Sequence, residues 1–323
     1  MMGAMQILDA EQTARALPWR ALALAIEQTL ADEAAGRVQA PERWVLPVSP
    51  GTSWFLMPAW LAPEAGDLAA IKLITYAAAN AQRGLPAILG DVLVMRASTG
   101  ERLAMLDGPT VTARRTAAVS LLAVQRLAAQ PAGPLLIIGT GVQALSHLQA
   151  LSEGAGVREV WVRGRTPQRS REFIARVQGV LQGQVRDDVV LQPADDLDAA
   201  LQRCPLVITA TPAAAPCLEG PLRADAFVAA IGAFTPAMIE LAPPLTRQLV
   251  ATGRVVIDSA AARHEAGDLL GAGIDTTGLP TLGEVLAEAP RPRGGAVLFK
   301  SCGAALWDLA AARCAVAGLK PAG

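Results

Sequence analysis

One short segment constrains the fold of this chain more than any other. An apolar run over residues 135–138 ends in the pattern Gly-x-Gly-x-x-Ala, formed by Gly139, Gly141 and Ala144, and a helix-compatible stretch follows over residues 142–153. In a strand–turn–helix unit the first glycine permits a tight turn, the second admits a phosphate to the main chain, and the alanine allows close packing. The segment therefore predicts the phosphate-binding turn of a dinucleotide fold. Its predicted cofactor contacts are Gly139, Thr140, Gly141, Val142 and Gln143.

The chain after this turn alternates between short apolar runs and helix-compatible stretches. The apolar runs cover residues 135–138, 159–163, 189–192, 206–210, 227–231, 255–258 and 296–300. Strands that are apolar nearly throughout and alternate with helices are typical of a parallel sheet covered on both faces. The predicted fold class is α/β, with a Rossmann doubly wound parallel sheet.

Residues 7–107 follow another pattern. Helices are predicted over residues 18–35 and 112–130, the second capped by Thr110 or Thr112. The β-like runs cover residues 44–48, 53–57, 69–75, 91–96 and 102–106. Alternation of apolar and polar residues within them predicts a mostly antiparallel sheet with one face solvated or covered by a partner.

Composition excludes several functions. The chain has 323 residues, enough for two domains, and its 28 basic and 29 acidic side chains nearly balance, which argues against nucleic-acid binding. No apolar run reaches the length of about 18 residues that a transmembrane helix needs, and the first residues lack the features of a secretion signal. Four cysteines without Cys-x-x-Cys spacing predict buried thiols. We expect a cytoplasmic protein with no nucleic-acid or membrane partner and no metal site.

The end of the second strand of such a sheet distinguishes the two nicotinamide dinucleotides. Here it reads Arg163-Gly164-Arg165-Thr166, with no carboxylate before Glu172. A carboxylate would suit the ribose hydroxyl of NAD, whereas a guanidinium suits the 2′-phosphate of NADP. We therefore favour NADP(H), with Arg165 and Thr166 as contacts, and NAD(H) as the possible alternative. A solvated arginine loop is the other interpretation.

Two threonines follow the fourth strand of the predicted sheet. Thr209 and Thr211 lie where strand ends line a cofactor cleft, so their hydroxyls are predicted cofactor contacts. A β-turn closed by Pro212 explains the segment equally well.

Several pieces of the chain, in order, resemble the ornithine cyclodeaminase/mu-crystallin family. They are Met57-Pro58-Ala59, Lys72 in its β-like run, Leu106-Asp107-Gly108, Arg115-Thr116-Ala117-Ala118, the Gly139–Ala144 turn, Thr211-Pro212, Ile231-Gly232-Ala233, Glu265-Ala266-Gly267-Asp268 and Phe299-Lys300-Ser301-Cys302-Gly303. The resemblance implies that residues 113–299 form an NAD(P)-binding Rossmann domain. It also implies that this domain is inserted into a smaller α+β substrate-binding and dimerisation domain, made of residues 1–112 plus 300–323.

The resemblance further implies a homodimer, a small α-imino or α-amino acid substrate, and cofactor contacts at Ile231 and Ser301. By similarity, Arg43, Lys72 and Arg115 are the basic residues that bind the substrate carboxylate, with Lys72 and Arg115 also catalytic. An ordinary salt bridge or a snorkelling lysine is the alternative, and we accept it for Arg114. Glu265 matches a family position near the ligand, and His147 is predicted to be structural.

One departure from the family pattern bears on the reaction. Cyclodeaminases of this family carry an aspartate where this chain has Phe234 and a lysine where it has Met238. Phenylalanine cannot accept a proton, so the general base for ammonia loss and ring closure is missing. Mu-crystallin-like ketimine reductases also lack this aspartate.

The sequence therefore favours an NAD(P)H-dependent oxidoreductase that reduces a small cyclic or linear α-imino acid, such as pyrroline-2-carboxylate. Three alternatives stay open. They are an ornithine cyclodeaminase that forms proline and ammonia, an alanine-dehydrogenase-like enzyme, and a non-catalytic NADPH-binding protein.

Overall fold

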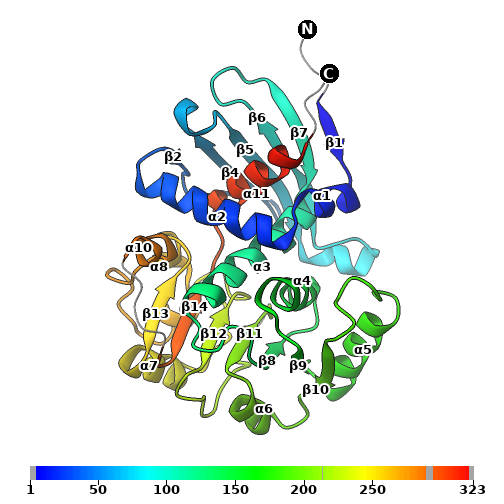
Figure 1. Cartoon of the computed structure of the whole chain (residues 1–323), viewed down its shortest axis with the longest axis vertical. Helices are drawn as coiled ribbons and strands as arrows, with labels where there is room; N and C mark the ends of the chain where they lie inside the picture. The colour runs from blue at the N-terminus through cyan, green and yellow to red at the C-terminus, as the bar shows by residue number, and fades with distance from the viewer. Residues whose placement is uncertain (1–4, 213, 289–293, 320–323) are drawn as a thin grey trace. The chain divides into compact units, whose positions relative to one another are not determined.

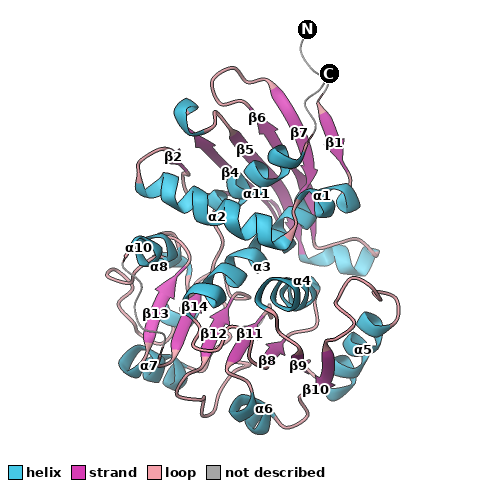
Figure 2. Ribbon diagram, in the orientation of Figure 1, coloured by secondary structure: helices cyan, strands magenta, loops and turns pink. Residues whose placement is uncertain are grey.

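The computed structural model describes residues 5–212, 214–288 and 294–319. Its contacts divide the chain into two compact units, Met1–Thr116 with Ala304–Gly323, and Ala117–Gly303. We call them unit one and unit two. Figures 1 and 2 label their helices and strands.

Unit one is built on a sheet with the strand order β1-β7-β6-β5-β4-β2, in which β3 also pairs with β4. The strands are β1 (Gln6–Leu8), β2 (Val38–Gln39), β3 (Trp44–Ser49), β4 (Thr52–Leu61), β5 (Ala69–Ala77), β6 (Ile88–Met95) and β7 (Arg102–Asp107). Their pairings are antiparallel, except that β1 runs parallel to β7. The predicted, mostly antiparallel sheet is confirmed.

Two helices, α2 (Trp19–Ala34) and α11 (Ala305–Gly318), pack on one face of this sheet (Figure 1). That face receives every second side chain of β4, with Met57, Ala59 and Leu61 buried, as the period of a half-buried strand requires. The shorter helix α1 (Ala10–Ala16) follows β1, and 3₁₀ turns cover Pro63–Ala65 and Ala78–Arg83.

The opposite face of the sheet is apolar but exposed. Its large side chains are Trp44, Leu46, Trp54, Trp60, Ile71, Leu73 and Leu89, with exposed fractions between 37% and 63%. The register places them together, because Leu46 pairs with Trp54, Trp54 with Thr75, and Thr75 with Leu89 across four strands. We call this surface the apolar face. Large exposed apolar patches of this kind mark interaction surfaces.

The long helix α3 (Gly108–Leu127) begins in unit one and ends in unit two. The predicted start at residue 112, with Thr110 or Thr112 as the cap, is wrong. The helix begins at Gly108, and the carboxylate of Asp107 accepts the N–H of Thr110 at 2.8 Å. An aspartate is as good a cap as a threonine, and it lies directly before the first turn.

Unit two contains a seven-stranded parallel sheet with the order β10-β9-β8-β11-β12-β14-β13. The strands are β8 (Leu135–Ile138), β9 (Glu159–Arg163), β10 (Val190–Pro193), β11 (Leu206–Thr209), β12 (Phe227–Ala230), β13 (Arg254–Ile257) and β14 (Val297–Lys300). All their pairings are parallel. The order reverses at β8, so a switch point lies between β8 and β11, where doubly wound sheets bind ligands. The predicted fold class is confirmed.

Helices connect these strands on both faces of the sheet (Figure 2). They are α4 (Val142–Ala150), α5 (Pro167–Gln178), α6 (Leu197–Arg203), α7 (Pro243–Thr252), α8 (Ala262–Glu265), α9 (Gly267–Leu270) and α10 (Leu282–Ala287). The helix predicted over residues 142–153 ends as a regular α-helix at Ala150 and continues as a π-helical turn, Leu151–Ala155. Within the described ranges, no helix combines the length and apolar character needed to cross a membrane.

The cysteines match the predicted thiols in chemistry but not all in burial. All four are free, and Cys204, Cys302 and Cys314 are buried, whereas Cys217 is half-buried. Burial raises the pKa of Cys204 and of Cys217 to about 12 and that of Cys314 to about 11. Thiols with such pKa values are poor nucleophiles at neutral pH, which fits a packing role.

Candidate functional site

The glycine turn has the geometry that a phosphate-binding loop requires. Gly139 has a φ of 134°, and a Cβ at this position would lie 2.5 Å from the carbonyl oxygen of Ala210, so no other residue fits without strain. A Cβ at Gly141 would meet nothing within 4 Å, which leaves open space beside the start of α4. The first glycine is thus needed for the turn, and the second lies where a ligand can approach.

The residues at this turn fit a dinucleotide pyrophosphate. Gly141 is the N-cap of α4 and has no side chain to accept the N–H groups of the first helical turn. Val142 is 69% exposed although it is apolar. A helix N-terminus with open donors binds anions. Arg176 from α5 adds a positive charge here, because its Nη2 donates to the carbonyl of Thr140 at 3.3 Å. The sequence analysis did not single out Arg176.

His147, on the same helix α4, is fully buried against α3. Its Nδ1 lies 2.8 Å from the carbonyl oxygen of Gln143, and its Nε2 lies 2.9 Å from Oγ of Ser120. Burial lowers the pKa of His147 to about 4, although the contact with Gln143 opposes this shift. A neutral imidazole that joins two helices fits the predicted structural role.

The buried His147 should make stability depend on pH. Its folded pKa of about 4 lies below its unfolded value, so the unfolded chain binds the extra proton as pH falls. The stabilisation is therefore complete above about pH 6.5 and is lost towards pH 4. Between pH 7 and 5 we expect wild type to lose about 2 kcal/mol of unfolding free energy more than His147→Gln, measured by urea denaturation. The control His264→Gln changes an exposed histidine and should keep the wild-type slope; equal slopes in wild type and His147→Gln would contradict the assignment.

The residues of the arginine loop after β9, 163–166, have different surroundings. Arg163 donates from Nη1 to the carbonyls of Ala194 and Asp195 at 2.9 and 3.0 Å, which ties the loop to the end of β10. Thr166 is the N-cap of α5, since its hydroxyl accepts the N–H of Arg169. Arg165 is exposed beside this helix start. Of the two predicted contacts, Thr166 is thus engaged in capping, while Arg165 points a guanidinium to the surface at the carboxyl end of β9.

The other predicted cofactor residues lie at neighbouring strand ends. Thr209 ends β11, Ile231 follows β12, and Ser301 follows β14, and these strands are adjacent in the sheet. The hydroxyl and the N–H of Thr211 both donate to Oε1 of Glu240, at 3.0 and 2.7 Å. A β-turn closed by Pro212, the other interpretation of this segment, does not explain these contacts. The hydroxyl of Ser301 donates to Oδ2 of Asp258 at 2.8 Å.

Two acidic residues whose side chains contact the segments after these strands were left without a role by the sequence analysis. Glu240 and Asp258 are buried and hold backbone N–H groups, Asp258 accepting that of Gly303 at 2.8 Å. A charged residue inside an apolar segment is the signal that could have identified them, since buried carboxylates need several donors.

In unit one, two predicted substrate-binding residues, Lys72 and Arg115, lie close together. Lys72 from β5 and Arg115 from α3 flank Asp308 from α11, and all three are buried. The Nζ atom of Lys72 lies 2.9 Å from both carboxylate oxygens of Asp308, and Nε of Arg115 lies 3.4 Å from Oδ1. Asp308 is a further residue that the sequence analysis left unassigned. We call these three residues the cation cluster.

Burial and the neighbouring charges set the pKa of Lys72 in the cation cluster. Burial lowers the pKa of Lys72 to about 8; Asp308 opposes this shift, while the positive charges of Arg115 and of the half-buried Arg43 reinforce it. The cluster therefore brings a lysine and an arginine against one buried carboxylate. Such basic side chains suit a carboxylate ligand, because a guanidinium offers a carboxylate two parallel hydrogen bonds.

Two further residues that the sequence analysis named, Arg114 and Glu265, are not members of the cation cluster. Arg114 donates to the carbonyl of Leu17 at 2.8 Å and stacks over the ring of Trp19, which is the structural role expected for it. Glu265 is half-buried on α8 and belongs to unit two, so it shares no unit with Lys72 and Arg115.

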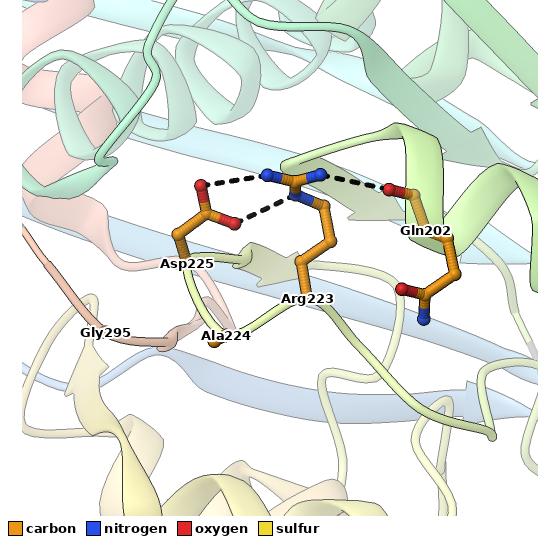
Figure 3. Close-up of a pocket in the computed structure, with 5 residues that line it drawn as sticks. All are labelled: Gln202, Arg223, Ala224, Asp225 and Gly295. Carbon is orange, nitrogen blue, oxygen red and sulfur yellow. Dashed lines mark hydrogen bonds and ion pairs between the residues drawn. The ribbon is translucent and has the colours of Figure 1, made fainter.

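A surface pocket in unit two is formed by Gln202, Arg223, Ala224, Asp225 and Gly295 (Figure 3). The guanidinium of Arg223 is held by Asp225 and by the carbonyl of Gln202. These residues precede β12 and β14, at the amino-terminal edge of the parallel sheet. Doubly wound sheets bind ligands at the opposite edge, so this pocket is not the predicted site.

Comparison with known proteins identifies the family. The model of the ornithine cyclodeaminase/mu-crystallin family matches residues 4–318. The chain is 40% identical over 309 residues to "Delta(1)-pyrroline-2-carboxylate reductase 1" of Burkholderia multivorans, covering 96% of this chain and 94% of the relative. It is 35% identical to "Ketimine reductase mu-crystallin" of Mus musculus, covering 86% and 84%. The structure of Thermococcus litoralis Delta(1)-pyrroline-2-carboxylate reductase, in complex with NADH and L-proline, superposes with a TM-score of 0.84 at 24% identity, covering 97% of both chains. The predicted family is confirmed: this chain belongs to the ornithine cyclodeaminase/mu-crystallin family.

Proposed function

We propose that this protein is a nicotinamide-dependent reductase of small α-imino acids, with cyclic ketimines such as Δ1-pyrroline-2-carboxylate as substrates. The observation that carries the proposal is the cation cluster, in which the buried side chains of Lys72 and Arg115 both lie against the carboxylate of Asp308. Relatives at 40% and 35% identity are a pyrroline-2-carboxylate reductase and a ketimine reductase, which supports the same reaction.

We assign dinucleotide binding to unit two. The turn formed by residues 139–143 would hold the pyrophosphate, and the strand ends at Thr209, Thr211, Ile231 and Ser301 would line the remainder of the cofactor. When bound, the reduced nicotinamide supplies the hydride that reduces the C=N carbon. NADP(H) is the favoured form, because Arg165 can bind a 2′-phosphate, and NAD(H) is the alternative.

We assign substrate binding to unit one. Arg115 and Lys72 hold the substrate carboxylate, and Arg43 adds positive charge to the same region. The imine nitrogen needs a proton as its carbon receives the hydride. Lys72 is suited to this task, since its pKa of about 8 lies near the working pH of an enzyme. Asp308 keeps the ammonium in place. The products are a secondary amine and oxidised cofactor.

The 231–241 segment supports reduction over cyclodeamination. Phe234 and Met238 stand at the positions of the cyclodeaminase aspartate and lysine, so ornithine would find no base there for ammonia loss. Reduction of a preformed imine does not need that base. Glu265, on α8 of unit two, is proposed only as a polar contact.

A direct assay tests the proposal. Purified protein should oxidise NADPH or NADH in the presence of Δ1-pyrroline-2-carboxylate or Δ1-piperideine-2-carboxylate and form the corresponding cyclic amino acid. Ammonia and proline produced from L-ornithine and NAD, with no imine reduction, would show a cyclodeaminase instead. Cofactor binding without turnover of any imino acid would show a non-catalytic protein.

The cofactor assignment predicts the result of a charge reversal. Arg165→Asp should lower kcat/KM for NADPH about 100-fold, because two charge-assisted hydrogen bonds are lost and a repulsion is added, while NADH should change by less than about threefold. Arg171→Asp is the matched control, since Arg171 is an exposed arginine of α5 that pairs with Asp195 at 2.7 Å. Equal losses with both cofactors would count against a role of Arg165 in phosphate binding.

We further propose that unit one mediates a homodimer through the apolar face. We expect a second copy of the chain to cover this surface, because the apolar face is continuous over four strands. It is the face of the sheet on which α2 and α11 do not pack. Leu73→Glu should give particles with the mass of one chain in light scattering, since the interface would bury an unpaired charge. Val180→Glu, at an 86% exposed position in unit two, is the control and should leave the wild-type mass unchanged. A wild-type protein that is already monomeric at micromolar concentration would refute the dimer.

A further inference from the structure

Glu240 joins the ends of two adjacent strands of unit two. Its side chain is fully buried. One carboxylate oxygen accepts the N–H and the hydroxyl of Thr211, after β11, at 2.7 and 3.0 Å. The other accepts the N–H groups of Gly232 and Ala233, after β12, at 2.6 and 3.1 Å. A single side chain therefore connects the segments that follow these two strands.

A second layer of buried charges fixes Glu240 itself. Asp268 accepts the backbone N–H groups of Glu240 and Leu241 on one oxygen, at 2.6 and 2.9 Å. Its other oxygen forms an ion pair of 2.8 Å with Lys300, whose Nζ also donates to the carbonyl of Ala233. Both ends of the loop over residues 232–240 are therefore held by the same network of buried charges.

The loop between these anchors has little freedom. Gly267 lies so close that a Cβ on it would be 2.0 Å from the carbonyl oxygen of Met238 and 2.7 Å from that of Thr235. This loop carries Phe234 and Met238, the two residues that depart from the cyclodeaminase pattern. Its position relative to the strand ends is therefore fixed from both sides.

The electrostatics fit a positioning role better than a stabilising one. Burial raises the pKa of Glu240, while Lys300 and the N–H groups of Thr211 and Gly232 oppose this rise. Burial would lower the pKa of Lys300, but Asp268, Cys302 and Glu240 together raise it. Buried charges of this kind cost desolvation and often add no net stability over apolar packing. The four hydrogen bonds that converge on Glu240 do, however, define a single arrangement of the groups that donate them.

We propose that Glu240 is a positioning residue for hydride transfer, which holds the ends of β11 and β12 and the loop after Ile231 in the arrangement that supports the nicotinamide half of the cofactor. The proposal rests on the proposed function, because it takes the dinucleotide to lie along the carboxyl ends of these strands. In a doubly wound sheet the two halves of the cofactor use the two halves of the sheet. The Gly139 turn and Arg165 serve the adenosine half, on β8 and β9, whereas β11 and β12 serve the other.

The test is Glu240→Gln. The amide group keeps the size of the side chain but turns an N–H₂ towards backbone donors, so one of the two strand ends is released. We expect kcat for imine reduction to fall about 100-fold, because a misplacement of about 1 Å can cost that much. Binding of 2′,5′-ADP, which reports the adenosine half alone, should stay within about twofold. The primary deuterium isotope effect with 4-deuterated NADPH should rise as hydride transfer becomes slower.

Glu284→Gln is the control. Glu284 accepts the N–H of Thr281 at 2.7 Å in the capping box of α10, a role that glutamine also fills, so both kcat and 2′,5′-ADP binding should be unchanged. Two results with Glu240→Gln would overturn the proposal. One is an unchanged kcat and isotope effect; the other is a parallel loss of 2′,5′-ADP binding, which would mean general structural damage.

A failure of the proposed function is distinguishable from a failure of this inference. In the first case wild type reduces no imino acid, and the inference is judged on cofactor binding. Glu240→Gln should then weaken NADPH at least fivefold more than 2′,5′-ADP, and hydrogen exchange of the cofactor-free protein should speed up at residues 211, 232 and 233 alone. Equal weakening of both ligands, or unchanged exchange, would overturn the inference.

Discussion

Replacing Lys72 with methionine should lower kcat/KM for Δ1-pyrroline-2-carboxylate about 1,000-fold. The change removes a positive charge from the carboxylate site and the proposed proton donor, and general acid catalysis alone contributes about 10²–10⁴-fold. Methionine is unbranched and of similar length, so it can fill the buried position between β5 and α11. Steady-state kinetics with saturating NADPH measure the effect.

The Lys72→Met variant also needs a test of folding. Its affinity for 2′,5′-ADP should equal that of wild type, because that ligand is proposed to bind unit two. Arg114→Met is a matched control in unit one, since Arg114 stacks on Trp19 and lies one position from Arg115. It should keep most of the activity. A loss below about tenfold in Lys72→Met would rule out Lys72 as the proton donor.

The second large effect is expected from Asp308→Asn, and it should appear as a shift in pH dependence. The protonated form of Lys72 is the active one in the proposed mechanism, so activity should fall as pH rises through its pKa of about 8. Asp308 is the group that opposes the lowering of this pKa by burial, Arg115 and Arg43. Without its charge the pKa falls further, and the basic limb of the kcat/KM profile should move down by about 1–2 pH units.

The outcome with Asp308→Asn separates two roles. A uniform drop in kcat/KM with an unmoved basic limb would mean that Asp308 only positions Lys72, or that Lys72 does not carry the proton. Asparagine has nearly the same size as aspartate, so packing of α11 against β5 should be kept. Thermal unfolding of the variant, measured beside the kinetics, monitors that packing.

The fold was predictable where local signals are strong. The parallel sheet of unit two was predicted from apolar runs that alternate with helices. The turn was predicted from Gly139, and its positive φ and the nearby carbonyl of Ala210 explain why glycine is required there. The start of α3 was predicted at residue 112, with Thr110 or Thr112 as the cap, whereas the helix begins at Gly108 and Asp107 accepts the N–H of Thr110. Local rules identify a set of possible caps, and the backbone path then selects one.

Only some residues of the candidate site could be predicted from the sequence. Lys72 and Arg115 were identified through family resemblance, but their partner Asp308 lies 236 positions after Lys72, in the first turn of a mostly apolar helix. Glu240 and Asp268 received no role from the sequence, because their hydrogen bonds go to backbone groups of distant segments. No local pattern encodes such contacts; only the lone charge in an apolar stretch hints at them.

The position of Asp308 in the last helix also has a consequence for synthesis on the ribosome. Unit two is one continuous stretch of chain, whereas unit one needs both the first 116 residues and the final helix. During translation the strand with Lys72 emerges long before its carboxylate exists, and a buried ammonium without a counter-charge is strongly disfavoured. Unit two can therefore complete its folding first, and unit one closes its core only once α11 has been synthesised.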